Sequence, residues 1–142
     1  MNRLNGIKEA GQDSQIMTHS SIDSERYYRG EIYSLEKKLS SNPKCIDSIK
    51  SWIENYHHLA SIYQERGEHM MAQKCYLIPH HSMLYMARHK KDEESELIAI
   101  HAINLTLPAL MKFAEEYPPC KKCLRDLREQ MQMIEKTISN YH

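Results

Sequence analysis

A set of small, aromatic and aliphatic residues recurs at fixed intervals in the middle of the chain. The steps between its members are 3, 1, 3, 4, 5 and 4 residues, and the members are Tyr56, Leu59, Ala60, Tyr63, Gly67, Ala72 and Tyr76. Steps of three and four place side chains on one face of a helix, and glycine favours the left-handed conformation that ends one. Alanines let two helices approach closely, while tyrosines fill the space beside them. The pattern therefore predicts two antiparallel helices joined by a turn at Gly67.

The composition favours helices along the rest of the chain as well. The chain has 142 residues, with no Val, three Thr and four Gly. Sheets usually collect β-branched and aromatic residues, so a chain without Val offers little material for one. Most of the fourteen Ile residues recur at the three- and four-residue steps of a helix face. We therefore expect one all-α domain over residues 1–142.

Hydrophobic periodicity and helix-breaking residues divide the chain into segments. Residues 1–14 are polar and are expected to form a flexible arm or a weak helix. Helices are predicted over 24–39, 46–66, 68–77 and 80–89, followed by a buried helix over 92–117 and a closing helix over 120–141. Pro79 is expected to bend or end the helix before it, because proline cannot donate the helical hydrogen bond.

The residues from Tyr56 to Tyr76 resemble a tetratricopeptide repeat, whose unit spans about 34 residues. The family prefers large, large, small, aromatic, Gly, small and aromatic residues in this order. The match covers residues 53–86 well and 16–49 loosely, where Arg29-Gly30-Glu31 precedes Arg66-Gly67-Glu68 by 37 residues. The chain as a whole is similar to small bacterial tetratricopeptide-like proteins of unassigned function. The resemblance implies a right-handed stack of antiparallel helical hairpins, closed by a long C-terminal capping helix.

The same resemblance implies a non-catalytic module that binds a protein or peptide in a concave groove. The groove would be lined by the first helix of each hairpin. By position in the repeat, the partner-binding residues would be Tyr27, Tyr28, Glu54, His57, Ser61, Gln64 and Glu65. This set lacks the paired basic residues with which some such grooves clamp a terminal carboxylate. The alternative is that these side chains form an ordinary solvated face.

Cys120 and Cys123 form the sharpest chemical motif, a CxxC pair next to two lysines. Two thiolates at this spacing can share a zinc ion, which needs two further nitrogen or sulfur ligands. The candidates for these are His80, His81, His101 and Cys75. The pair could instead be a redox dithiol, or both cysteines could simply pack. His101 lies in the most apolar segment and is expected to be a hydrogen-bonded core histidine. A metal-binding or thiol-redox protein is therefore the alternative function.

The closing segment carries an apolar seam with heptad spacing. Its members step by 4, 3, 4, 3, 4 and 3 residues and are Cys120, Leu124, Leu127, Met131, Ile134, Ile138 and Tyr141. Such a seam suits a capping helix that covers the end of a helical stack. It also suits a narrow homodimer interface, although three heptads are marginal for a free-standing coiled coil. We favour the cap and keep the homodimer as the alternative.

Charge and hydropathy limit the remaining functions. Nineteen basic residues balance nineteen acidic ones, which disfavours nucleic-acid binding. The longest apolar run, residues 97–113, is interrupted by His101, Asn104 and Pro108, so a buried helix is expected rather than a membrane span. The start of the chain lacks the apolar core of a signal peptide, and the four cysteines are expected to be reduced thiols in the cytoplasm. No catalytic motif is recognisable, so we expect neither an enzyme nor a cofactor.

Overall fold

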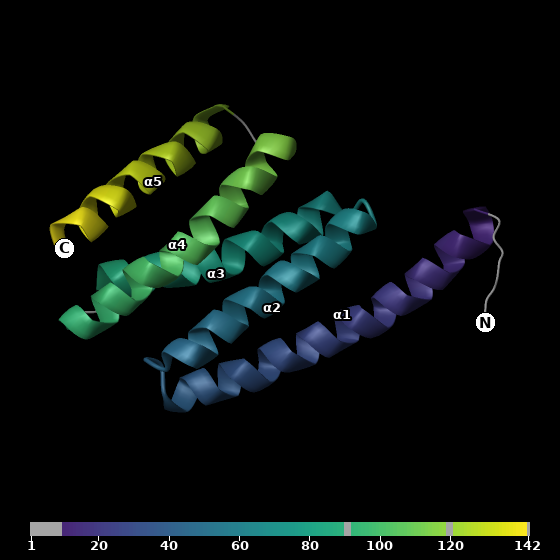
Figure 1. Cartoon of the computed structure of the whole chain (residues 1–142), viewed down its shortest axis with the longest axis horizontal. Helices are drawn as coiled ribbons and strands as arrows, with labels where there is room; N and C mark the ends of the chain where they lie inside the picture. Colours follow the sequence, from purple (N-terminus) through teal and green to yellow (C-terminus); the bar gives the residue numbers. More distant parts are fainter. Residues whose placement is uncertain (1–9, 90–91, 119–120, 142) are drawn as a thin grey trace.

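A computed structural model describes residues 10–89, 92–118 and 121–141 and contains five α-helices in these ranges (Figure 1). The helices are α1 (Ala10–Ser41), α2 (Ile46–Glu65), α3 (His69–His89), α4 (Glu93–Glu116) and α5 (Lys121–Tyr141). Each helix packs against the next one in the chain, and α2 also contacts α4. In Figure 1, α1 and α5 lie at opposite ends of this row. The described residues contain no strand, which confirms the all-α prediction.

The turn between α2 and α3 is built around Gly67, as the sequence predicts. Gly67 has a φ of 77°, in the left-handed region that glycine adopts without strain. Its N–H donates to the carbonyl of Gln64 at 3.0 Å, and the N–H of Glu68 donates to the carbonyl of Tyr63 at 2.8 Å. This pair of bonds is a Schellman motif, which satisfies carbonyls that the end of α2 would otherwise leave without partners.

The core lies between α2, α3 and α4. Ala60 and Ala72 are both fully buried, as are the larger side chains of Ile53, Tyr63 and Ile103. Burying each large apolar side chain contributes roughly 1.5–3 kcal/mol, so this contiguous cluster supplies most of the stability. The small residues therefore lie in the tightly packed region where the spacing of the sequence placed them.

Helix α4 is the most apolar of the described helices. Its length and composition would allow it to cross a membrane, yet 56% of its apolar window is buried inside the protein. Ile103, Leu107 and Phe113 of this helix belong to the hydrophobic core. A core helix accounts for these features, and the sequence predicted a buried helix over the same segment.

The structure differs from the predicted helices at two places. The first helix is predicted over 24–39 and does run through Gly30, but α1 is longer and spans Ala10–Ser41. The apolar stripe of Ile32, Leu35 and Leu39 continues the helical period past Gly30 and packs on the core, which outweighs the modest cost of a helical glycine. Similarly, α3 continues through Pro79, whose side chain is itself buried in the interior.

A polar cluster fixes α1 against the end of α2. The hydroxyl of Tyr63 donates to Glu25 Oε2 at 2.6 Å, and Arg66 Nη2 contacts Glu25 Oε1 at 2.8 Å. Arg29 contacts both Glu25 and Tyr63. The hydrogen bond from Tyr63, followed by those from the two arginines, lowers the pKa of Glu25 to about 2 even though partial burial opposes the shift. Burial in turn raises the pKa of Tyr63 to about 12.

Candidate binding groove between α2, α3 and α4

A pocket of about 500 Å³ lies where the second half of α2 faces the second half of α4. We call it the His57 groove. It is lined by His57, Ser61, Gln64, Tyr76, Ala109, Lys112, Phe113 and Glu116. Tyr76 comes from α3, which packs against both of the other helices. The lining thus combines aromatic rings with neutral polar groups and with one charge of each sign.

His57 carries an unsatisfied polar atom at this pocket. Its Nε2 is buried and has no hydrogen-bond partner among the described residues. Burial lowers the pKa of His57 to about 4, and the neighbouring His58 contributes less to the shift. The ring is therefore neutral at pH 7, with one nitrogen able to donate and the other able to accept a hydrogen bond. A buried polar atom without a partner is uncommon, and His69 Nδ1 is a second such atom among the described residues.

Gln64 and Tyr76 form a hydrogen-bonded pair in the same pocket. The Tyr76 hydroxyl donates to Gln64 Oε1 at 2.7 Å. This bond uses the oxygen of the amide, so the amide nitrogen keeps two hydrogens that can be donated elsewhere. Burial raises the pKa of Tyr76 and keeps its hydroxyl protonated. The pair therefore holds a donor group in place beside His57.

An aromatic row runs beneath and beyond the pocket. The ring centroids of His57 and Tyr76 are 5.4 Å apart, and those of Tyr76 and Phe113 are 5.2 Å apart. Tyr117 continues the row at 5.2 Å from Phe113 and stacks on His69 at 4.0 Å. These separations are typical of interacting rings. The row gives the pocket a rigid apolar floor assembled from three helices.

The charges at the rim come from α4. Lys112 and Glu116 are four residues apart on this helix, are exposed, and both line the pocket. Their positions place both side chains on one face of the helix. A ligand lying along the pocket would meet a cation and an anion in succession.

Comparison with known families places the whole helical array in one group. The model of a family described as "Protein of unknown function (DUF2753)" matches residues 9–141. The chain belongs to the DUF2753 family. The match reaches from the start of α1 to the end of α5, so the five helices together correspond to the DUF2753 unit. No curated protein and no solved structure matches the chain.

The DUF2753 structure brings together only some of the residues that the repeat pattern singled out. His57, Ser61 and Gln64 meet in the His57 groove. Glu54 and Glu65 are exposed on α2 and do not line the pocket. Tyr27 is 61% exposed on α1, and Tyr28 stacks on His58 with 5.0 Å between centroids.

Five pocket residues are not predicted from the sequence, namely Tyr76, Ala109, Lys112, Phe113 and Glu116. The repeat pattern marks Tyr76 as a packing residue only. The other four lie on α4, beyond residue 87, where the repeat pattern has no match. A usable signal was the spacing of Lys112 and Glu116, which places two polar residues on one side of an otherwise apolar helix.

The CxxC prediction concerns Cys120 and the side chain of Cys123, which lie outside the described residues. Of its suggested additional ligands, Cys75 and His80 are buried. Burial raises the pKa of the Cys75 thiol to about 11. Both ring nitrogens of the buried His80 are engaged, one with Thr106 at 3.0 Å and one with Gln130 at 2.9 Å.

His101, expected in the core, is exposed instead, and the buried histidine of this region is His80. The periodicity of α4 explains the difference. Ala99, Ile100, Ala102 and Ile103 occupy the core-facing positions around His101, which leaves that residue on the outer side of the helix. Across the described residues, no group of three or more His, Cys, Asp or Glu side chains could hold a metal ion.

Proposed function

We propose that this DUF2753 protein is a non-catalytic recognition module that binds a protein segment in the His57 groove. The proposal includes the finer architecture implied by the tetratricopeptide resemblance, a right-handed stack of antiparallel hairpins closed by α5. In such a stack, the first helices of successive hairpins line the concave face. The direct contact between α2 and α4, and their joint lining of the groove, support this assignment.

One observation carries the proposal: the buried Nε2 of His57 has no hydrogen-bond partner among the described residues although it belongs to a residue that lines a pocket. Leaving such an atom unsatisfied costs about 1–3 kcal/mol. A peptide can supply the missing group when the His57 ring turns toward the pocket, because every residue except proline brings a backbone N–H and a carbonyl. The amide nitrogen of Gln64 offers a second donor for a carbonyl in the same segment.

The rest of the lining defines the chemistry of the segment. The Tyr76–Phe113 floor suits an aromatic or aliphatic side chain. Lys112 and Glu116 suit side chains of opposite charge placed along the segment. Among the described residues, Lys112 is the only cation of the lining, so a carboxylate clamp built from two basic residues is not expected. We infer a mixed, near-neutral segment rather than an acidic tail or a nucleic acid.

The closing helix supports a cap in preference to a homodimer. Leu127 and Met131, two members of the heptad seam, pack against the core. Gln130 of the same helix reaches His80 of α3. Seam residues that pack against the core are not available to contact a second copy of the chain. We therefore propose that α5 covers the end of the stack. We place the protein in the cytoplasm, without a membrane or nucleic-acid partner.

Affinity capture tests the proposal by comparing a variant inside the groove with a control variant on the same helix outside it. The full chain is immobilised, and proteins retained from an extract of the organism that encodes it are identified by mass spectrometry. The double variant His57→Ala, Gln64→Ala should lose a partner that the wild type retains. The control Glu54→Ala, Glu65→Ala alters the same helix outside the pocket and should retain that partner.

A second variant separates loss of binding from loss of folding. Lys112 and Glu116 are exposed, so changing both to Ala should leave the circular dichroism spectrum unchanged while weakening capture. Equal capture by the wild type and by both groove variants would refute the proposal. Loss of capture in the control alone would place the recognition surface on the outer face of α2.

A further inference from the structure

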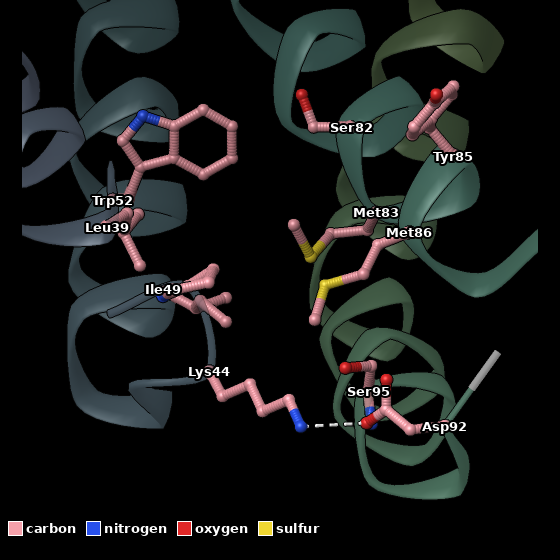
Figure 2. A pocket seen from close by; sticks show the side chains of 11 residues that line it. Leu39, Lys44, Ile49, Trp52, Ser82, Met83, Tyr85, Met86, Asp92 and Ser95 are labelled. Carbon is pink, nitrogen blue, oxygen red and sulfur yellow. Dashed lines mark hydrogen bonds and ion pairs between the residues drawn. The ribbon is translucent and has the colours of Figure 1, made fainter. Parts of the chain in front are cut away.

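A second pocket, of about 280 Å³, lies at the other end of α2 (Figure 2). It shares no lining residue with the His57 groove. Its walls come from the junction of α1 and α2 on one side and from α3 and the start of α4 on the other. Figure 2 shows Trp52 and Ile49 on one wall, with the side chains of Met83 and Met86 extending toward them.

The apolar part of the lining belongs to the hydrophobic core, whereas the ends of the cavity are exposed. Ile49, Trp52, Met83 and Met86 are only 3–7% exposed, although all four line the cavity. A volume of about 280 Å³ is small for a helix or an extended segment of another protein. The cavity therefore suits a small molecule. Its volume approaches the range of about 300–1,000 Å³ that is typical of ligand pockets.

The polar groups of the cavity lie at its ends. At one end, Lys44 Nζ contacts Asp92 Oδ2 at 2.9 Å and Glu94 Oε1 at 3.2 Å (Figure 2). The positive charge of Lys44 is therefore outweighed by two carboxylates, so this end of the cavity does not attract an anion. At the other end lie the hydroxyl groups of Ser82 and Tyr85. The cavity thus favours a neutral ligand that carries at most one polar group.

The chemistry of the walls favours an aromatic ligand. Thioether sulfurs contact aromatic rings favourably, and unbranched methionine side chains adapt to the shape of a guest. The indole of Trp52 faces the two methionines across the cavity and offers a further aromatic contact. For comparison, an apolar cavity of about 150 Å³ accepts benzene, so scaling by volume gives about ten non-hydrogen atoms for this one.

We propose that this cavity binds a small, neutral aromatic molecule of one or two rings, between Trp52 and the Met83–Met86 pair. The site is independent of the His57 groove, so an experiment can refute one of the two proposals without affecting the other. The ligand would contact side chains of the hydrophobic core, and its binding would stabilise the folded state by mass action.

Indole, a neutral aromatic compound of suitable size, is the probe for a titration of the full chain. The methyl groups of the methionines are labelled with ¹³C and followed by NMR, and Met83 and Met86 are assigned by substituting each with Leu. Met70 and Met133 are 76% and 66% exposed and serve as internal controls. The chain has a single Trp, so its one indole N–H signal reports Trp52 directly.

The expected result is a saturable shift of the Met83, Met86 and Trp52 signals, with Met70 and Met133 unchanged. Ser82→Leu fills one end of the cavity and should weaken binding at least tenfold. The control Ser34→Leu makes the same change at an exposed position of α1 and should bind indole as the wild type does.

Benzoate, an anion of similar size, should bind at least tenfold more weakly than indole. Shifts that do not saturate, or that affect the exposed methionines equally, would overturn the proposal. So would unchanged binding in a folded Ser82→Leu variant. If that variant does not fold, the titration of the wild type decides alone.

Discussion

The same substitution, Gly to Ala, should have opposite effects at two glycines of this chain. Gly67 has a φ of 77°, whereas Gly30 lies inside α1. A Cβ atom added at either position would meet no atom within 4 Å. Steric contact with neighbouring groups is therefore excluded at both sites, and the difference between them comes from the backbone alone.

The magnitudes follow from the two conformations. An L-residue in the left-handed region costs roughly 1–2 kcal/mol, so Gly67→Ala should lower the free energy of unfolding by about that amount. Gly67→Val should cost more, since a β-branched side chain tolerates a positive φ poorly. Helical glycine is less favourable than alanine by about 0.5–1 kcal/mol, so Gly30→Ala should raise the free energy of unfolding by that amount.

Urea unfolding followed by circular dichroism measures both changes. The midpoint should move down for Gly67→Ala and up for Gly30→Ala, with similar slopes for all variants. A midpoint that falls for Gly30→Ala would mean that Gly30 is not in a helical conformation. A midpoint that is unchanged or raised for Gly67→Ala would refute the left-handed turn between α2 and α3.

Three further predictions concern the core and the titrating groups. Ala72→Leu should overpack the helix crossing and cost about 1–3 kcal/mol in urea unfolding, whereas Lys74→Leu at an exposed position should cost little; equal tolerance would argue against close packing at Ala72. The pKa of Glu25 is lowered to about 2 by the Tyr63 hydroxyl and by nearby arginines, so its contribution is present above about pH 4.5 and is lost as the pH falls toward 2. Glu25→Gln should therefore lower the free energy of unfolding at pH 7 by roughly 1–2 kcal/mol, after allowance for solvent screening. The variant should also lose less free energy of unfolding than the wild type between pH 4.5 and 2. An equal loss in both proteins over this pH range would refute the prediction. The pKa of His57 is lowered to about 4, so its ring signals in NMR should titrate near that pH. Its contribution to the free energy of unfolding should decrease as the pH is lowered from 6.5 to 4. Titration near pH 6.5 would show that the ring is solvated.

The central pair of helices could be predicted because its signals are local. The apolar stripe of α2 ends at a glycine whose turn needs a positive φ, and Ala60 and Ala72 lie at steps that bring them into the core. These features depend on residues within one or two helical turns of each other. Backbone geometry alone relates them to structure, without knowledge of the rest of the fold.

The passage of α3 through Pro79 could not be predicted, because packing decides whether a helix continues through such a residue. Glycine and proline weaken a helix by about 1 and 3 kcal/mol respectively. Ile32 and Leu35 on α1, and Met83 on α3, bury enough apolar surface next to the glycine or proline of their helix to offset such costs. Helix propensity predicts a boundary poorly wherever the free energy of burying nearby apolar side chains is as large as the propensity cost.

The candidate groove was predictable only on its α2 side. His57, Ser61 and Gln64 follow from their position in the repeat pattern, but Lys112 and Glu116 lie some fifty residues further along the chain. The contact between α2 and α4 brings the two sets together. A helix that is apolar on most of its surface does not reveal from its sequence which polar residues face a neighbour.

Site-specific photocrosslinking tests the recognition surface most directly. Benzoylphenylalanine is placed at Ser61, an exposed position in the His57 groove, or at Glu65, an exposed position four residues later that does not line it. Irradiation in cells should attach a protein partner to the Ser61 variant and not to the Glu65 variant. Attachment at Glu65 with none at Ser61 would contradict the assignment of the groove.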